Sequence, residues 1–428
     1  MESFVIEGGH PLRGEVTPSG NKNAALPLLA ACLLTDEPVL LHNVPDIGDV
    51  RTMRALIETL GVDIQTVENH TLRLHAQQVR KADLDRDLCR RMRASILLAG
   101  PLLGRTGEVV LPLPGGDVIG RRRVDTHLLA LQAYGVEADY RQGMLHLRAP
   151  SGLHGARVLL DEASVTATEN AILAAVTARG ETSIRNAASE PHVQDLCHML
   201  NALGARIENI GSNSLRIEGV PALRGGEYAI GPDYLEVVSF IGAAAVTGGE
   251  IRIRRAAPEH LEMVRLVFGR LGIVWEEDGA DLHVPAPQPL QVVPDLRGAI
   301  PQISVMPWPA FPTDLMSLAI VLATQSHGTV LFHDWMFEGR MFFIDKLAAM
   351  GARIVLCDPH RCLVEGPSRL VGEQLESPDI RAGLALLTAA LAAEGTSHIR
   401  NIGQIERGYE RIDEKLKALG AHIRRVES

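Results

Sequence analysis

Residues 251–276, IRIRRAAPEHLEMVRLVFGRLGIVWE, combine a strand pattern, a short loop, an amphipathic helix pattern, a glycine and a second strand. The apolar residues of the helical part recur at three- and four-residue intervals, which is typical of a helix with one buried face. Gly272 follows this helix directly, at the place where a left-handed residue commonly ends a helix. We interpret the rest of the chain from this strand–helix–strand unit.

The same unit occurs elsewhere in the chain. Similar segments are residues 39–65, 183–208, 330–355 and 397–424, and residues 109–139 form a more divergent sixth copy. A glycine follows each helix, and these glycines are spaced by roughly 70 residues; they are Gly61, Gly135, Gly204, Gly272, Gly351 and Gly420. The spacing indicates six repeats of one supersecondary unit.

The units also contain a second kind of helix, which is apolar on nearly all sides. Five such segments are NKNAALPLLAACLL (21–34), TATENAILAAVTA (166–178), YLEVVSFIGAAAV (234–246), TDLMSLAIVLAT (313–324) and IRAGLALLTAALAA (380–393). A helix that is hydrophobic all round is buried. We therefore predict an α/β fold of two domains, each an inside-out α/β barrel of three repeats with its helices buried.

The two ends of the chain indicate how the domains are connected. Residues 4–20, FVIEGGHPLRGEVTPSG, resemble the strand pair that completes a unit, whereas the last unit stops after its final strand. We expect the N-terminal residues to complete that last unit. One domain then comprises residues 1–20 plus 232–428, and residues 21–231 form an inserted domain that carries a lid loop around residues 113–123.

Composition excludes several classes of protein. The chain has 42 Lys and Arg against 52 Asp and Glu, which argues against nucleic-acid binding through bulk positive charge. The N-terminus lacks the features of a signal peptide, and the apolar stretches are too short to span a bilayer.

We expect a cytoplasmic protein with no metal, cofactor, membrane or nucleic-acid partner, monomeric or weakly homo-oligomeric. Its five cysteines lack CxxC spacing and are expected to be reduced thiols: Cys32, Cys89, Cys197, Cys357 and Cys362.

Eight short motifs lie in order along nearly the whole chain. They are SGNKNAALP (19–27), MRAS (92–95), LPGGDVIGRR (113–122), SVTATEN (164–170), FPTD (311–314), FEGR (337–340), PDIRA (378–382) and IERGYERI (405–412). Each is a weak pattern alone, but together they resemble the enolpyruvyl transferases. The resemblance implies transfer of the enolpyruvyl group of phosphoenolpyruvate to the 3-hydroxyl of UDP-N-acetylglucosamine, with release of phosphate. This reaction is the first committed step of peptidoglycan precursor synthesis.

The resemblance also implies which residues form the site. The phosphoenolpyruvate-binding residues are Lys22, Asn23, Arg122, Arg381 and Arg407. The acceptor-binding residues are Arg93, Arg122, Arg123, Val124, Asp125, Thr126, Glu162, Ser164, Val165, Asp314 and Met336. Catalysis is assigned to Lys22, Asp117, Asp314 and Arg407, with Asp314 as the base that takes the sugar hydroxyl proton. We expect residues of both domains to contribute.

The residue types suit this chemistry, although each also has an ordinary structural interpretation. A lysine at a helix start lies beside free N–H groups and suits an anion, and arginine binds phosphate and carboxylate in a bidentate manner. Lys22 is otherwise a solvated helix-start lysine, and Asp314 and Asp379 are otherwise N-cap residues. Arg340 is expected to form an inter-domain ion pair.

The sequence departs from the family pattern in the glycine loop. The usual cysteine after Leu-Pro-Gly-Gly is replaced by Asp117. A carboxylic acid can protonate C3 of phosphoenolpyruvate, although holding an aspartic acid of ordinary pKa neutral at pH 7 costs about 4 kcal/mol. The resemblance implies resistance to fosfomycin, which alkylates the missing thiolate; a mere turn residue is the alternative for Asp117. Gln404 also departs from the pattern, because histidine often occupies that position.

Two other functions stay open from the sequence. One is an enolpyruvyl transferase that acts on a different nucleotide or sugar. The other is a non-catalytic paralogue that binds a sugar nucleotide.

Overall fold

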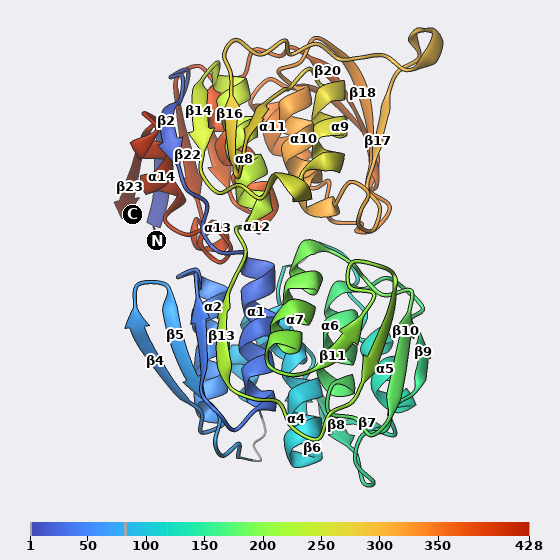
Figure 1. Cartoon of the computed structure of the whole chain (residues 1–428). Helices are drawn as coiled ribbons and strands as arrows, with labels where there is room; N and C mark the ends of the chain where they lie inside the picture. The colour runs from blue at the N-terminus through green and yellow to red at the C-terminus, as the bar shows by residue number, and fades with distance from the viewer. Residues whose placement is uncertain (1, 81–83, 118, 428) are drawn as a thin grey trace. The chain divides into compact units, whose positions relative to one another are not determined.

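The computed structural model describes residues 2–80, 84–117 and 119–427 (Figure 1). Val118 of the glycine-loop motif therefore lies outside the described residues. The chain divides into two compact units. Unit 1 consists of Met1–Ser19, Val118–Arg121 and Pro232–Ser428, and unit 2 of Gly20–Asp117 and Arg122–Gly231.

The described residues of unit 2 form three sheets. Their strands, in spatial order, are β13 (Gly226–Ala229), β3 (Val39–His42), β5 (Thr71–His75) and β4 (Asp63–Glu68); β6 (Glu108–Pro112), β8 (Met144–Arg148) and β7 (Glu137–Arg141); and β11 (Arg206–Glu208), β12 (Ser214–Glu218), β10 (Glu181–Arg185) and β9 (Arg157–Leu159).

In unit 1, too, the part of the chain that the structure describes forms three sheets. Their strands, in spatial order, are β15 (Glu276–Asp278), β16 (Asp281–Val284), β14 (Glu250–Ile253) and β2 (Arg13–Val16); β17 (Gln302–Ser304), β18 (Gly328–His333), β20 (Arg361–Gly366) and β19 (Arg353–Asp358); and β21 (Gln374–Glu376), β22 (Thr396–Arg400), β1 (Glu2–Glu7) and β23 (His422–Glu427).

The four-stranded sheets share one pairing pattern. Each has a single parallel pair at one edge, and its remaining pairs are antiparallel. In the last sheet β1 lies between β22 and β23 and is antiparallel to both. The first strand of the chain is thus enclosed by two of the last, whereas β2 pairs with β14 instead.

The helices of each unit complete its secondary structure. Unit 2 has α1 (Lys22–Ala31), α2 (Gly48–Thr59), α3 (Arg86–Arg91), α4 (Ala99–Thr106), α5 (Asp125–Ala133), α6 (Val165–Ala175) and α7 (Pro191–Ala202), with 3₁₀ turns η1 (Cys32–Leu34) and η2 (Arg93–Leu98). Unit 1 has α8 (Tyr234–Thr247), α9 (Glu262–Arg270), α10 (Met316–Ala323), α11 (Ile344–Ala349), α12 (Ile380–Ala392), α13 (Gly403–Glu406) and α14 (Ile412–Ala418), with η3 (Pro258–His260), η4 (Leu296–Gly298) and η5 (Thr313–Leu315). The chain is therefore a mixed α/β protein.

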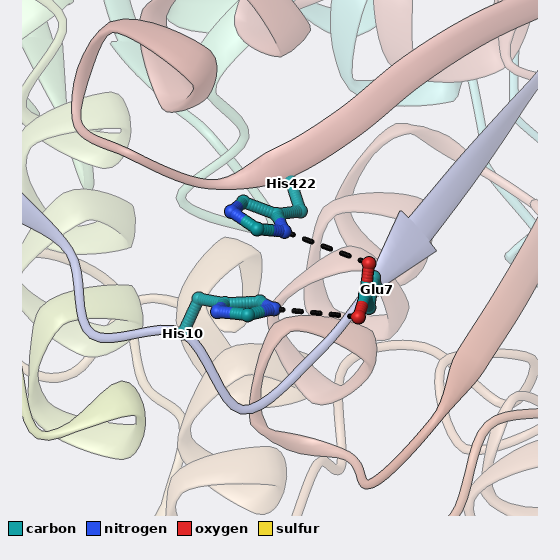
Figure 2. A group of neighbouring side chains, drawn as sticks. All are labelled: Glu7, His10 and His422. Carbon is teal, nitrogen blue, oxygen red and sulfur yellow. Dashed lines mark ion pairs between the residues drawn. The ribbon is translucent and has the colours of Figure 1, made fainter.

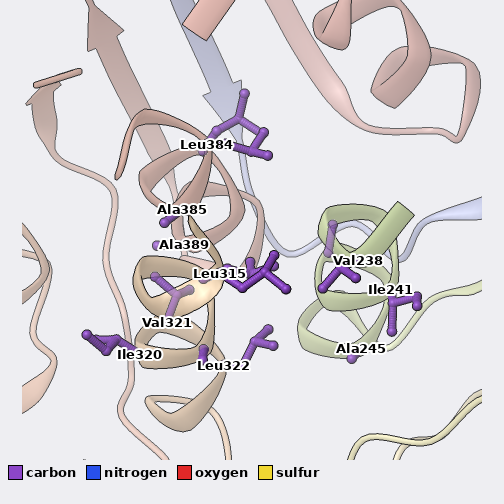
Figure 3. Close-up of a cluster of buried hydrophobic side chains, with 14 of the residues drawn as sticks. Val238, Ile241, Ala245, Leu315, Ile320, Val321, Leu322, Leu384, Ala385 and Ala389 are labelled. Atoms are coloured by element: carbon purple, nitrogen blue, oxygen red, sulfur yellow. The ribbon is translucent and has the colours of Figure 1, made fainter. Parts of the chain in front are cut away.

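The five all-apolar segments form helices that are buried along nearly their whole length. These helices are α1, α6, α8, α10 and α12. In unit 1, side chains of α8, α10 and α12 form one apolar cluster, which includes Val238 and Ile241 of α8 and Leu322 of α10 (Figure 3). A Cβ atom on Gly242 would lie 3.1 Å from Leu322 Cδ2, so the glycine lets α8 approach α10 closely.

The glycines that follow the amphipathic helices have the predicted conformation. All six have a positive φ, between 76° and 102°. A side chain is strained in this left-handed region, so glycine ends these helices at little cost. The prediction from the repeat pattern is confirmed.

Two other observations concern the whole chain. No helix among the described residues has the length and apolar character needed to cross a bilayer. Residues 119–121 of the glycine loop belong to the predicted inserted domain, but their contacts group them with unit 1. In this segment Ile119 O accepts a hydrogen bond from Gly339 N (2.9 Å), and Glu338 Oε2 accepts one from Arg121 N (3.2 Å).

The buried helices predict a sharp difference between two leucine substitutions. Leu322 is fully buried between α10 and α8, whereas Leu296 is 88% exposed. Leu322→Ala is expected to lower the free energy of unfolding by about 2–5 kcal/mol, because it leaves a cavity. Leu296→Ala is expected to change it by less than about 0.5 kcal/mol. Urea unfolding of both variants measures the difference, and equal midpoints would contradict the assignment of α10 to the core.

Candidate functional site

Many of the predicted site residues lie at the starts of helices. The first turn of a helix presents free N–H groups and partial positive charge, which favour anionic ligands. The residues at such positions are Lys22 and Asn23 in α1, Arg93 in η2, Asp125 and Thr126 in α5, Val165 in α6, Asp314 in η5 and Arg381 in α12.

Lys22 is held at the start of α1 in unit 2. Asn21 caps the helix, because its Oδ1 accepts hydrogen bonds from Asn23 N (2.8 Å) and Ala24 N (3.2 Å). The Lys22 side chain is buried, and its Nζ lies 2.9 Å from Asp49 Oδ2 in the first turn of α2. The interpretation of Lys22 as a solvated lysine is therefore wrong. Asp49 was not identified from the sequence, since only the tertiary contact distinguishes it from other aspartates.

The glycine loop before Asp117 fits closely against its neighbours. A Cβ atom on Gly115 would lie 1.7 Å from Arg90 O, and one on Gly116 would lie 3.1 Å from Arg93 Cβ. Gly116 also has φ of 105°. Glycine is thus required at both positions, and the backbone leading to the half-buried Asp117 runs directly against Arg93.

Arg93 belongs to a group of charged residues in unit 2. Its Nη2 donates a hydrogen bond of 2.6 Å to Arg123 O. Burial, followed by the positive charge of Arg122, lowers the pKa of Arg93 to about 10, while Glu162 acts in the opposite direction. Arg93 therefore stays charged at neutral pH. Two guanidinium groups held near each other favour a ligand with phosphate groups.

Asp161 fixes the start of α5 beside these cations. Thr126 Oγ1 donates a 2.7 Å hydrogen bond to Asp161 Oδ1, and Arg123 Nη2 donates one of 3.1 Å to Asp161 Oδ2. The Thr126 hydrogen bond is the main reason why the pKa of Asp161 is lowered, and Arg123 adds to the effect. Sequence reasoning missed Asp161, although it directly precedes Glu162. Ser164 caps α6, as its position before the apolar segment predicts.

A buried polar network joins several helical segments within unit 2. Asn170 Nδ2 donates to Ile96 O (3.1 Å), and Asn170 Oδ1 accepts from Gly100 N (2.8 Å). The same Nδ2 lies 3.2 Å from His127 Nδ1, and His127 Nε2 lies 3.1 Å from Thr166 Oγ1. Through Asn170 and His127 the network connects α6 to η2, α4 and α5. Sequence reasoning did not identify it.

The network requires a neutral His127. Burial lowers the pKa of His127 to about 3, and the charge of Arg93 contributes in the same direction. With Asn170 donating to Nδ1, the proton resides on Nε2, which donates to Thr166. A protonated ring would lose the bond from Asn170 and leave a buried charge.

This burial predicts an acid-dependent loss of stability. Since the folded-state pKa is about 3 and the unfolded value about 6.5, the unfolded chain binds the proton first as the pH falls. The contribution of His127 is complete above pH 6.5 and falls by about 3 kcal/mol at pH 4. His127→Gln should therefore show a weaker dependence of unfolding free energy on pH between 6.5 and 4 than the wild type. His154→Gln, which replaces an exposed histidine, serves as the control. Parallel curves of unfolding free energy against pH for His127→Gln and the wild type would contradict the prediction.

Asp314 is the centre of a charged cluster in unit 1. Its Oδ1 accepts a hydrogen bond from Arg340 Nη2 (3.3 Å), and its Oδ2 accepts one from Arg381 Nε (3.1 Å). The N-cap residue of α10 is Leu315, so Asp314 is not the cap. Arg340 pairs here with a carboxylate of its own unit, and the inter-domain ion pair expected for it stays a prediction. Two guanidinium groups orient the Asp314 carboxylate.

Asp379 is the cap of α12, as the alternative interpretation predicts. Its Oδ1 accepts hydrogen bonds from Arg381 N (2.8 Å) and Ala382 N (3.0 Å). The same oxygen lies 3.8 Å from Arg340 Nη1. The cap therefore also joins the charged cluster around Asp314.

Arg381 is buried beside Tyr409. Its Nη1 donates a 2.7 Å hydrogen bond to Tyr409 Oη, and its guanidinium carbon lies 5.3 Å from the centre of the ring. Burial alone would lower the pKa of Arg381, but nearby groups, among them the Asp314 carboxylate, raise it well above its ordinary value. Burial raises the pKa of Tyr409 to about 12, so this phenol is neutral. Tyr409 lies inside the predicted IERGYERI motif but was not singled out.

Arg407 and Met336 are positioned by neighbouring polar groups in unit 1. Arg407 Nη1 donates a 2.9 Å hydrogen bond to Gln404 Oε1, one turn earlier. Met336 N donates one of 3.0 Å to Asp334 Oδ1, and Thr313 Oγ1 donates one of 2.5 Å to Asp334 Oδ2. Burial raises the pKa of Asp334. Asp334, which sequence reasoning missed, thus ties the loop after β18 to the residue before Asp314.

Comparisons with known proteins agree along the whole chain. The family model described as EPSP synthase (3-phosphoshikimate 1-carboxyvinyltransferase) matches residues 6–416. A relative from Bradyrhizobium diazoefficiens is 59% identical over 423 residues, covering 99% of this chain and 98% of that protein. One from Treponema denticola is 53% identical and covers 99% of each chain. Both are named UDP-N-acetylglucosamine 1-carboxyvinyltransferase.

Solved structures agree with this placement. The enolpyruvyl transferase NikO from Streptomyces tendae superposes with a TM-score of 0.88 at 25% identity, covering 100% of this chain and 99% of that one. EPSP synthase from Acinetobacter baumannii shares the fold, with a TM-score of 0.77 at 17% identity over 100% of both chains. By its family match and its full-length relatives, the chain belongs to the EPSP synthase family of enolpyruvyl transferases.

Proposed function

We propose that this protein is a UDP-N-acetylglucosamine 1-carboxyvinyltransferase. It transfers the enolpyruvyl group of phosphoenolpyruvate to the 3-hydroxyl of UDP-N-acetylglucosamine and releases phosphate. The observation that carries the proposal is identity of 59% and 53%, over 99% of the chain, to relatives of that name. The reaction would serve peptidoglycan synthesis in the cytoplasm, and with it cell-wall formation, cell shape and division. For the fold, we propose that each unit is an inside-out barrel of three repeats.

Proton removal from the acceptor hydroxyl is assigned to Asp314. A base must accept the proton as the hydroxyl oxygen attacks C2 of phosphoenolpyruvate. Arg340 and Arg381 hold the Asp314 carboxylate through one oxygen each, at 3.3 and 3.1 Å. Each carboxylate oxygen has a second lone pair, so a base oriented in this way can still accept a proton. Arg381 and Arg407 are assigned to the anionic groups of phosphoenolpyruvate.

Anion binding in unit 2 is assigned to Lys22, Asn23 and Arg122. Lys22 and Asn23 lie in the first turn of α1, where the helix dipole adds to the lysine charge. The ion pair with Asp49 holds the ammonium group in place, since both partners are buried. Phosphate groups of the substrates then meet a cation whose position is already fixed.

Recognition of the nucleotide sugar is assigned to the residues around the starts of α5 and α6. Guanidinium groups suit the diphosphate, and the free N–H groups of a helix start suit its oxygens. The contributing residues are Arg93, Arg122, Arg123, Val124, Asp125, Thr126, Glu162, Ser164 and Val165 of unit 2, with Asp314 and Met336 of unit 1.

Protonation of C3 is assigned to Asp117. The glycine that precedes this residue lies against Arg93, and we assign to Asp117 a neutral carboxylic acid that donates its proton to the methylene carbon as the C2–O bond forms. Departure of phosphate and return of the C3 proton to a base then regenerate the enol ether. The aspartate replaces the thiol chemistry of the common family loop.

Phosphate release with different acceptors tests the proposed function. The purified chain is incubated with phosphoenolpyruvate and, in turn, UDP-N-acetylglucosamine, other UDP-sugars, UMP and shikimate 3-phosphate. Release is expected with UDP-N-acetylglucosamine. Release only with another acceptor would indicate a different enolpyruvyl transferase, and no release with any acceptor would indicate a binding protein without catalysis.

Substitution of Asp314 tests its role as base. Asp314→Asn preserves size but removes the proton acceptor, so kcat is expected to fall by about 10²–10⁴-fold. Binding of UDP-N-acetylglucosamine, measured by calorimetry, should persist. Asp345→Asn, a control on an exposed aspartate of α11, should keep kcat. A fall of less than threefold for Asp314→Asn would assign the base to another residue.

Substitution of Asp117 tests the acid and the drug response together. The wild-type protein should keep its activity after incubation with fosfomycin and carry no covalent adduct, because a carboxylate is a far weaker nucleophile toward an epoxide than a thiolate. Asp117→Cys should gain a covalent adduct in mass spectrometry, and its pH–rate profile should differ from that of the wild type because a thiol replaces the carboxylic acid. An adduct on the wild type, or identical pH–rate profiles, would leave Asp117 as a turn residue.

A further inference from the structure

Three side chains capable of binding a metal lie together in unit 1, two from the beginning of the sequence and one from its end (Figure 2). Glu7 is the last residue of β1, and His422 is the first residue of β23. The antiparallel register places these two residues directly opposite each other, so their side chains emerge on the same face of the sheet. His10 follows in the loop after β1.

Two of the distances between the potential ligand atoms are close to those of a coordination shell. His10 Nε2 lies 3.7 Å from Glu7 Oε1, and His422 Nδ1 lies 3.5 Å from Glu7 Oε2. Both distances exceed those of ordinary hydrogen bonds, about 2.7–3.2 Å. Two ligands of a tetrahedral zinc ion with bonds of about 2.0–2.1 Å are separated by about 3.4 Å. The three ligand atoms lie within 4.8 Å of one another.

The backbone positions the two imidazole rings against each other. A Cβ atom on Gly8 would lie 2.2 Å from Ala393 O, and Gly9 has φ of 81°, so only glycines permit the path from Glu7 to His10. The His10 and His422 rings stack with their centres 3.6 Å apart and their planes at 25°. Each ring directs one nitrogen toward the Glu7 carboxylate (Figure 2).

We propose that Glu7, His10 and His422 bind a divalent transition-metal ion, with zinc as the best match. Two imidazole nitrogens and one carboxylate form a three-ligand protein set that leaves a position for water. Imidazole favours zinc, copper or nickel over magnesium and calcium. The side chains are 36% exposed for His10, 63% for Glu7 and 55% for His422, so the ion can enter from solvent and the rings can rotate to direct their lone pairs at it. The ion would link the first strand of the chain to the last.

The chain offers matched controls for this site. His283 lies 3.0 Å from Glu250 and 3.5 Å from Glu276, and His42 lies 3.4 Å from Glu227. Each is an imidazole beside carboxylate on a sheet, without the second imidazole that completes the proposed set. These histidines test whether any exposed histidine–carboxylate pair is sufficient.

Metal titration of the untagged full-length chain tests the proposal. Calorimetry with Zn²⁺ is expected to show one saturable site per chain, and Co²⁺ should give the visible absorption of a four-coordinate ion. His10→Gln and His422→Gln should each weaken binding at least tenfold, and Glu7→Gln should weaken it as well. His283→Gln and His42→Gln should bind as the wild type does.

Thermal unfolding provides a second readout. Zn²⁺ should raise the unfolding temperature of the wild type and of both control variants, because a ligand of the folded state stabilises it. It should not do so for His10→Gln or His422→Gln, whose folding is checked by circular dichroism. Absence of saturable binding to the wild type, or equal affinity in His422→Gln, would overturn the proposal.

Discussion

Complete burial of the all-apolar helices is the constraint on which the rest of this structure depends. A helix such as α10 has no side that tolerates water, so strands and amphipathic helices must cover it. Polar groups can then be placed at low cost only at the helix ends, where the first N–H groups need partners. The candidate site residues lie there for this reason. Asp314 precedes α10, Arg381 opens α12 and Lys22 opens α1, so the same packing that builds each core also determines where charge can be held.

Charge at these ends is stable because it is paired inside each unit. Lys22 with Asp49, and Asp314 with Arg340 and Arg381, are ion pairs whose members come from different helices or loops. Removing one member of such a pair would leave the other charge poorly solvated, which is destabilising. The members of a partly buried cluster therefore stay together in a defined geometry. The neutral network around His127 also holds a defined geometry, without charged groups. It fixes the positions of η2, α4, α5 and α6 relative to one another.

The local sequence pattern predicted where helices lie and end, but it did not predict which distant residues contact the site residues. Repeated glycines predicted where helices end, and apolar runs predicted which helices are buried, because both effects act within a few residues. The motifs placed Asp314 and Arg381 at helix starts. Asp49, Asp161, Asp334 and Tyr409 escaped prediction because their importance arises from contacts with distant residues. The proximity of Glu7 to His422 follows from strand pairing across the length of the chain, which no spacing in the sequence reveals.

The position of β1 has a consequence for the order in which the chain can fold during synthesis. β1 leaves the ribosome first, yet its neighbours β22 and β23 are made last. Unit 2, formed almost entirely by the continuous stretch between residues 20 and 231, can complete its sheets while translation continues, since domains generally fold as units. Unit 1 must keep an apolar strand unpaired for nearly the whole time of synthesis. During that time the unpaired strand is exposed to non-native pairing, which makes incompletely folded chains prone to aggregation.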